Sequence, residues 1–188
     1  MRIVVGIAGA SGAVYAVRLL EMLEQIADVE THVTMTDSAL KNLQLELNYG
    51  LEDIKKISNT VYDNQDVAAA IASGSFPAHG MVVVPCSMKA LAGIATGFTD
   101  NLLLRSADVT IKEGRRLIIV PRETPLSVIH LENMLRLAKI PNITVLPAMP
   151  AFYHKPKNMD DLINHIVGKV LDQLKIKWPK ELFTRWGT

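Results

Sequence analysis

Short apolar runs alternate with helical patterns along almost the whole chain, and this alternation constrains the fold more than any other feature. Strand-like runs rich in apolar residues occur at 2–8, 31–35, 80–84, 116–120 and 143–147. Apolar residues recur at helical spacing over 12–26, 37–48, 65–73, 87–95, 100–113, 126–139 and 159–175. Buried-looking strands that alternate with helices are typical of a parallel sheet covered by helices on both faces. The sequence therefore predicts an α/β protein with a central parallel sheet.

The length and composition fit one folded domain over residues 1–188, with 49% hydrophobic residues to fill its core. Lys and Arg number 20 and Asp and Glu 19, so no excess of charge indicates a nucleic-acid partner. Neither a signal-peptide pattern nor a long apolar span is evident, and we expect a cytoplasmic protein without a membrane partner. A single cysteine, Cys86, excludes an intrachain disulfide and a Cys-rich metal site.

A glycine-rich turn joins the first apolar run to the first helical pattern in VVGIAGASGAVYA, residues 4–16. Its glycines are Gly6, Gly9 and Gly12. A strand, a glycine turn and a helix together direct backbone amides and the positive end of the helix at an anion. Glycine is suited to such a turn because a side chain would keep a phosphate away from the backbone. We therefore interpret this turn as a loop that holds a nucleotide phosphate.

The glycine turn leaves the nucleotide open. It lacks the Lys-Ser/Thr of a P-loop, which disfavours hydrolysis of ATP or GTP. Its spacing is similar to that of some NAD(P)-binding proteins, and Asp37 is placed to meet a ribose. Against this alternative, the chain is short for a dehydrogenase, and Tyr15 is not followed by the lysine of a Tyr-x-x-x-Lys pair. A tight turn that only packs helix on strand is a further alternative.

Polar residues follow two other predicted strands. Ser87 stands at an expected helix N-cap, where its hydroxyl either satisfies backbone amides or contacts a ligand. Arg122 can grip a phosphate, and the neighbouring Glu123 can move a proton. Because ligands of open α/β sheets bind at the carboxyl ends of the strands, we expect these loops to converge on one crevice. No histidine lies near Cys86 in the sequence, and we interpret Cys86 as a core thiol.

Two helical patterns carry cations on a polar side. Asn101, Arg105, Asp108 and Lys112 form one polar stripe along an otherwise apolar helix, which is either a solvent-exposed seam or the wall of a cleft. Lys169 lies on the polar side of the last helix, where a solvated lysine is usual.

The order of motifs resembles the UbiX-type flavin prenyltransferases, a family that includes small proteins associated with phenolic-acid decarboxylases. The likeness runs nearly end to end through GASGA, SGSF, PCSMKALA, ATG, NLLLRSADVTIKE, PRETPLSVIHLENML, PAMPAFYHKP and the closing RW. The motifs HLENML and AFYHKP are specific, whereas GASG alone is not. The resemblance implies a flavodoxin/Rossmann-like three-layer sandwich that joins the dimethylallyl group of dimethylallyl phosphate to N5 and C6 of reduced FMN. It also implies a homo-oligomer, often a dodecamer, and a UbiD-type decarboxylase that receives the prenylated flavin.

The resemblance further implies a set of site residues. Those expected to bind FMN are Gly9, Ala10, Ser11, Thr36, Ser87, Met88, Lys89, Ala90 and Arg122. Tyr153 and Lys169 would bind the prenyl phosphate, with Arg105 and Lys112 close by. Glu46 and Glu123 match an acidic pair, and Trp186 matches an aromatic residue near the allyl chain. Thr36 stands where serine is common in the family, and Lys169 stands where arginine is frequent. At position 169 the ammonium of lysine therefore replaces a guanidinium that could bind a phosphate through two nitrogens.

These residue types suit the chemistry of allylic transfer. Cations stabilise the departing phosphate, and a π surface stabilises the electron-poor allylic carbon. The pair Asp160-Asp161 lacks the third acid of an aspartate-rich magnesium motif, so we expect a monophosphate donor and no metal. Two alternatives remain: a non-catalytic FMN-binding subunit of an aromatic-acid decarboxylase, and a flavin-dependent cysteine decarboxylase. The second would carry a catalytic histidine after the first loop, where this chain has Val14-Tyr15.

Overall fold

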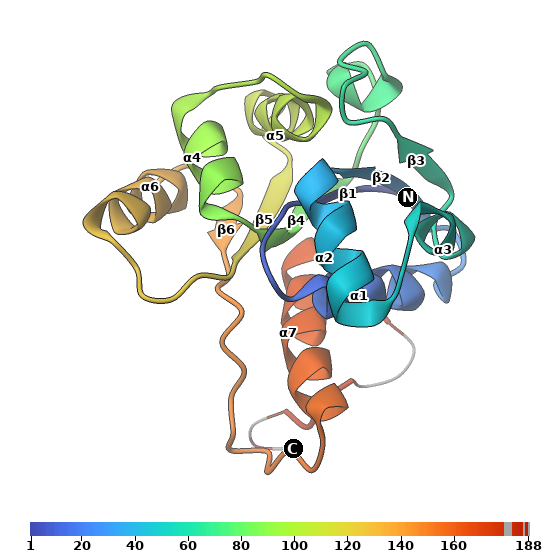
Figure 1. Cartoon of the computed structure of the whole chain (residues 1–188), viewed down its shortest axis with the longest axis vertical. Helices are drawn as coiled ribbons and strands as arrows, with labels where there is room; N and C mark the ends of the chain where they lie inside the picture. Colours follow the sequence, from blue (N-terminus) through green and yellow to red (C-terminus); the bar gives the residue numbers. More distant parts are fainter. Residues whose placement is uncertain (179–181, 186, 188) are drawn as a thin grey trace.

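The computed structural model describes residues 1–178, 182–185 and 187, and its centre is one sheet of six parallel strands (Figure 1). The strands are β1 (Arg2–Ile7), β2 (Glu30–Met35), β3 (Thr60–Tyr62), β4 (Gly80–Cys86), β5 (Arg116–Pro121) and β6 (Ile143–Val145). Their order across the sheet is β3-β2-β1-β4-β5-β6. The helices are α1 (Ala13–Glu24), α2 (Asp37–Leu47), α3 (Leu51–Lys56), η1 (Ala70–Ala72), α4 (Met88–Thr96), α5 (Leu102–Lys112), α6 (Val128–Ala138) and α7 (Met159–Leu174). The parallel α/β prediction is confirmed.

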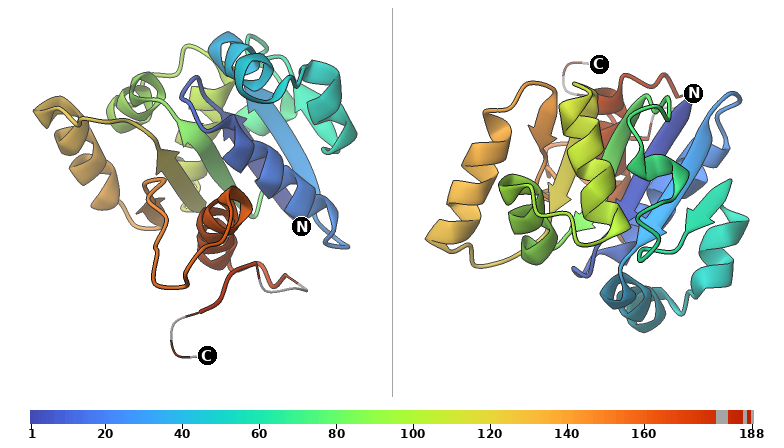
Figure 2. Two further views of the ribbon diagram at one scale, coloured as in Figure 1. Left: turned by 60° about the horizontal axis from the view of Figure 1, so that its bottom comes forward. Right: turned by 90° about the horizontal axis from the view of Figure 1, so that it is seen from above.

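Alternate residues of each strand enter two separate cores, one on each face of the sheet. Val5 of β1 packs in the core that α1 and α7 share, whereas Val4 packs in the core formed with α4 and α5. Arg18 of α1 ties the first of these helical layers together by hydrogen bonds to Asp160 and Asn164 of α7, each 2.9 Å long. Figure 2 shows the sheet between the two layers. No helix in the described part of the chain is long and apolar enough to cross a membrane.

The sequence prediction is wrong over 65–73, where most of the expected helix is replaced by turns and only η1 forms. Asp63 and Asp66 explain the difference. Their carboxylates accept hydrogen bonds from the backbone amides of Gln65, at 2.9 Å, and of Ala68, at 3.1 Å. Such local bonds compete with the helical pattern. The prediction also missed β3 and α3, which are too short to show a clear period.

One side of α6 remains uncovered. Leu137 of α6 is buried and Met134 packs against the same core, but Val128 and Ile129 are 67% and 64% exposed. Leu131 and Leu135 are also exposed apolar residues of this helix. A cluster of this kind marks an interaction surface more often than a solvent-facing one.

The C-terminal segment, residues 182–185, folds back onto α7. Phe183 is buried, and both guanidinium nitrogens Nη1 and Nη2 of Arg185 bind the carboxylate of Asp172, at 3.0 and 2.8 Å. Gly168 provides the space for Phe183, because a Cβ atom at Gly168 would lie 2.5 Å from the Phe183 ring. Because Gly168 has no side chain, the Phe183 ring can pack directly against the middle of α7 and hold the segment there.

We predict that Gly168→Ala destabilises the protein, although alanine normally favours a helix over glycine by about 1 kcal/mol. The methyl group would displace Phe183, and overpacking of this kind costs about 1–3 kcal/mol. In a Phe183→Ala background the same substitution should instead stabilise the protein by about 1 kcal/mol, because the methyl then has room. Urea unfolding of the parent, the two single variants and the double variant measures both effects. An equal effect of Gly168→Ala in the two backgrounds would show that Phe183 does not pack over Gly168.

Candidate functional site

A pocket of about 180 Å³ opens at the carboxyl edge of the sheet, between the loops that follow β1, β2 and β4. Its lining residues are Gly9, Thr36, Ser38, Ser87, Lys89, Ala90, Asn101, Leu103 and Leu104. Five of the residues expected to bind FMN from the resemblance are among them, and they come from three separate loops. β1 and β4 are neighbours here, at the point where the strand order reverses, and open α/β sheets bind ligands in the crevice at this point.

Two helix N-termini offer amides to this pocket. The Thr36 hydroxyl accepts a hydrogen bond from the amide of Ala39 at 3.2 Å, and the Ser87 hydroxyl accepts one from Ala90 at 3.3 Å. The hydroxyls therefore cap α2 and α4, as expected for Ser87. The amides of Met88 and Lys89 make no hydrogen bond within the described part of the chain. Free amides at a positive helix end, beside a lysine, suit a phosphate group.

Two other helix N-termini at this edge are closed by the chain itself. The backbone carbonyl of Asn64 accepts a hydrogen bond from the amide of Leu102 at 2.8 Å, and its side-chain Oδ1 accepts one from the amide of Leu103 at 3.0 Å. These bonds satisfy the first two amides of α5. At α1 the carboxylate of Glu46 accepts from the amides of Gly12 and Ala13, both at 2.9 Å. The amides of Gly12 and Ala13 at the start of α1 are therefore satisfied by Glu46, and the interpretation of the glycine turn as a phosphate loop stays a prediction.

The glycines of the first turn also have another reason than the one predicted. A Cβ atom at Gly9 would lie 2.3 Å from Cβ of Ser38, so the turn could not approach α2. Gly12 has φ +106°, a conformation that L side chains rarely adopt. Both positions are fixed by the packing and backbone of the chain. The contacts expected from Gly9, Ala10 and Ser11 to the flavin remain a prediction.

Arg122 connects the first turn to the end of β5. Its Nε donates a hydrogen bond to the backbone carbonyl of Ser11 at 2.9 Å, and its backbone amide donates one to the backbone carbonyl of Cys86 at 3.3 Å. A second pocket, of about 500 Å³, opens beside it and is lined by Pro121, Arg122, Glu123, Thr124, Leu126, Met134, Pro147, Ala148 and Met149. Glu123 is exposed, with one carboxylate oxygen 3.0 Å from the amide of Thr124. The loops after β1, β4 and β5 therefore contact one another, but they open onto two pockets and not onto the one crevice that was predicted.

Cys86 is fully buried at the end of β4, as predicted. Burial raises the pKa of its thiol far above the ordinary value, so the thiol stays protonated and unreactive. The described residues contain no group of three or more His, Cys, Asp or Glu side chains placed to hold a metal ion.

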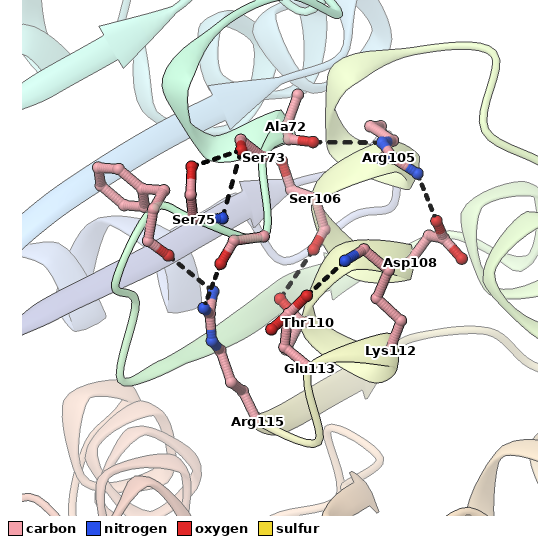
Figure 3. A network of polar contacts seen from close by, with 12 residues as sticks. Ala72, Ser73, Ser75, Arg105, Ser106, Asp108, Thr110, Lys112, Glu113 and Arg115 are labelled. Atoms are coloured by element: carbon pink, nitrogen blue, oxygen red, sulfur yellow. Dashed lines mark hydrogen bonds and ion pairs between the residues drawn. The ribbon is translucent and has the colours of Figure 1, made fainter.

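The predicted cationic stripe on α5 lies under the segment that precedes β4 (Figure 3). Arg105 donates to the carbonyl of Ala72 at 3.2 Å and pairs with Asp108 at 2.7 Å. Lys112 pairs with Glu113. A Cβ atom at Gly74 would lie 2.7 Å from the ammonium of Lys112, so this segment closes directly over that cation.

Tyr153 and Lys169 lie on the other side of the sheet. Lys169 is exposed on α7, and the ring of Tyr153 lies 6.3 Å from that of His165 on the same helix. Because α5 and α7 cover opposite faces, one chain does not bring Lys112 together with Lys169. Within one chain, the residues expected to bind the prenyl phosphate therefore lie on opposite faces of the sheet, as a site shared between subunits would require. Trp186 lies outside the described residues.

We predict that Glu46→Gln lowers the free energy of unfolding by about 0.5–2 kcal/mol, the usual value of an N-terminal cap. The amide oxygen can replace only one acceptor, and the negative charge at the positive end of α1 is lost. Glu24→Gln is the matched control, since Glu24 is exposed in the last turn of α1, where a negative charge is unfavourable. Thermal unfolding near neutral pH measures both, and equal effects of the two substitutions would contradict the capping role.

The chain is similar to known flavoproteins both in sequence and in structure. A family model described as Flavoprotein matches residues 1–171. Flavin prenyltransferase LpdB of Lactiplantibacillus plantarum is 56% identical over 98% of this chain and 97% of its own length. A crystal structure of a dodecameric FMN-dependent UbiX-like decarboxylase from Escherichia coli O157:H7 superposes with a TM-score of 0.95, at 46% identity and full coverage of both chains. The crystal structure of AnUbiX (PadA1) in complex with FMN and dimethylallyl pyrophosphate gives 0.94, at 43% identity over 100% of this chain and 97% of the other.

Proposed function

Because the chain belongs to the Flavoprotein family and, within it, to the UbiX-type flavin prenyltransferases, we propose that it joins a dimethylallyl group to N5 and C6 of reduced FMN. The donor we propose is dimethylallyl phosphate. The observation that carries the proposal is the convergence, in one pocket, of the predicted FMN-binding residues Gly9, Thr36, Ser87, Lys89 and Ala90. The same reasoning makes FMN, rather than NAD(P), the bound nucleotide.

The two pockets suit the two ends of the flavin. The smaller one combines the hydroxyls of Thr36 and Ser87 with Lys89 and the amides at the start of α4, and we assign it to the phosphate. The larger one has an apolar wall beside Arg122 and Glu123, which suits the isoalloxazine ring. Arg122 bridges the two regions through Ser11, so its substitution would affect both.

Glu123 is the residue we assign to proton transfer. When the new bond to N5 forms and the allylic C–O bond breaks, N5 loses its proton and the phosphate leaves with the bonding electron pair. An ionised carboxylate beside N5 can take that proton and pass it to a phosphate oxygen, which makes the phosphate a better leaving group. Glu123 is exposed in the larger pocket and, within the described part of the chain, accepts one hydrogen bond, from the amide of Thr124, so its carboxylate has room for both contacts.

We predict that Glu123→Gln slows prenylation by about 10²–10⁴-fold, the usual contribution of a general acid–base, while FMN binding stays near the parent value. The assay is anaerobic, with reduced FMN, a chelator, and mass spectrometry of the extracted flavin. Parallel reactions with dimethylallyl phosphate and with the diphosphate identify the donor. Glu24→Gln, on the far end of α1, serves as the control.

The outcomes of that assay are distinct. A parent protein that binds FMN but forms no prenylated flavin with either donor would overturn the proposed function and favour a non-catalytic FMN-binding subunit. A Glu123→Gln variant that reacts at the parent rate would instead leave the function intact and make Glu46 the next proton carrier to test.

We propose that the complete site forms between subunits of a homo-oligomer. Lys112 and Lys169 lie on opposite faces of the sheet, and α6 exposes Val128 and Ile129, which suits burial against another copy of the chain. The relative from Escherichia coli O157:H7 is described as dodecameric. The product, a modified flavin with no further use in this pocket, is proposed to pass to a decarboxylase of the UbiD type.

Mixing two inactive variants tests the shared site. Lys169→Ala and Lys112→Ala should each be nearly inactive, whereas subunit exchange between them should restore up to about one quarter of the parent activity, because an intact site then takes each lysine from a different chain. Native mass spectrometry of the mixture verifies the exchange. No recovery after verified exchange would contradict a site shared between subunits.

A further inference from the structure

His165 of α7, a residue that the proposed chemistry does not use, lies at the centre of an aromatic cluster. The cluster, which we call the His165 cluster, consists of Tyr153, His154, His165 and Phe183. The His154 ring stacks on the His165 ring with centroids 5.4 Å apart, and the Phe183 ring meets it edge-on at 5.0 Å. His165 is 7% exposed. It therefore touches both the segment after β6 and the C-terminal segment.

One hydrogen bond fixes the chemical state of this imidazole. The backbone amide of Ala151 donates to Nδ1 of His165, at 3.4 Å. Only an unprotonated nitrogen can accept, so the ring is neutral with its proton on Nε2. A protonated ring would place two N–H groups against each other and break the contact.

The surroundings also disfavour a charged ring. Burial lowers the pKa of His165, and the nearness of His154 and Lys169 lowers it further. The neighbouring pocket of about 410 Å³ is lined by the cations Lys155 and Lys157 and by the acid Asp161. Asp161 already accepts a hydrogen bond from the amide of Lys157 at 2.7 Å. Phe183 brings no charge from the C-terminal segment.

We propose that His165 is a positioning residue that, as the neutral imidazole, holds residues 151–154 against α7 and so places Tyr153, and that it releases them when it is protonated. This inference rests on the proposed function, in which Tyr153 and Lys169 bind the prenyl phosphate. Lys169 is one helical turn beyond His165, so the ring sets the distance between the two phosphate-binding residues. Acidification should therefore weaken binding of the donor phosphate more than it weakens binding of FMN.

Two substitutions separate packing from hydrogen bonding. His165→Asn keeps an acceptor near the position of Nδ1 and cannot titrate, whereas His165→Phe keeps an aromatic ring and removes the acceptor. In the parent, protection of residues 147–158 from hydrogen exchange, corrected for the intrinsic pH effect, should stay constant from pH 7.5 to about pH 6.5 and fall below that, because the pKa of His165 lies below its ordinary value. It should stay constant in His165→Asn and be low throughout in His165→Phe.

Donor binding gives the functional readout. Dimethylallyl phosphate is titrated into the protein loaded with oxidised FMN, so that no turnover occurs. His165→Phe should raise the Kd by about 2- to 10-fold, the effect of one hydrogen bond, with kcat and FMN affinity nearly unchanged. The parent should approach that value on acidification and His165→Asn should not, once the titration of the phosphate itself, common to all three, is subtracted.

Three results would decide the matter. Unchanged exchange and unchanged donor binding in His165→Phe would overturn the positioning role. If hydrogen-exchange protection and the donor Kd of the parent equal those of His165→Asn at every pH, the proposed release on protonation is overturned. Failure of the parent to form prenylated flavin would overturn the proposed function alone, since the exchange measurement does not depend on turnover.

Discussion

The position of β1 between β2 and β4 is the constraint on which the rest of the structure depends. Parallel pairing on both sides aligns Val5 with Val33 of β2 and with Val82 of β4, so three strands end at one edge. The chain then leaves β1 toward α1 on one face and leaves β4 toward α4 on the other. The smaller pocket opens between these diverging connections, where Gly9 and Ser87 both line it. A slip of one residue in this register would exchange the two cores and remove the pocket.

The same sheet that positions the smaller pocket also keeps Arg105 and Lys112 apart from Lys169. Arg105 and Lys112 belong to the layer of α4 and α5, while Lys169 belongs to the layer of α1 and α7. Each cation on α5 has a carboxylate neighbour, Asp108 or Glu113, which stabilises the positive charge in the absence of a phosphate. These pairs are partly exposed and therefore weak, so a phosphate with two negative charges can compete for the cations. A single subunit thus holds Lys112 and Lys169 on opposite faces of its sheet.

Sequence reasoning predicted what depends on local pattern and on the parallel edge. The strand-like runs predicted at β1, β2, β4, β5 and β6 all form strands, and the loops that carry Ser87 and Arg122 meet because parallel strands end together. Sequence reasoning could not predict hydrogen-bond acceptors that lie far away along the chain. Glu46 caps α1, which starts 33 residues earlier, and no periodicity predicts that pairing. Helical spacing identified the stripe on α5 but not the face of the sheet that α5 covers, whereas the polar position of Lys169 on the last helix already indicated that this lysine points away from its own chain's site.

The burial of Cys86 has a practical consequence. Alkylating reagents attack the thiolate, and a thiol sealed at the end of β4 with a strongly raised pKa offers almost none. The folded protein is in effect free of cysteine toward maleimides, although it contains one. A reporter cysteine introduced on the surface, for example in the C-terminal segment, would carry the label alone, and distances between fluorophores could be followed without first removing the native residue.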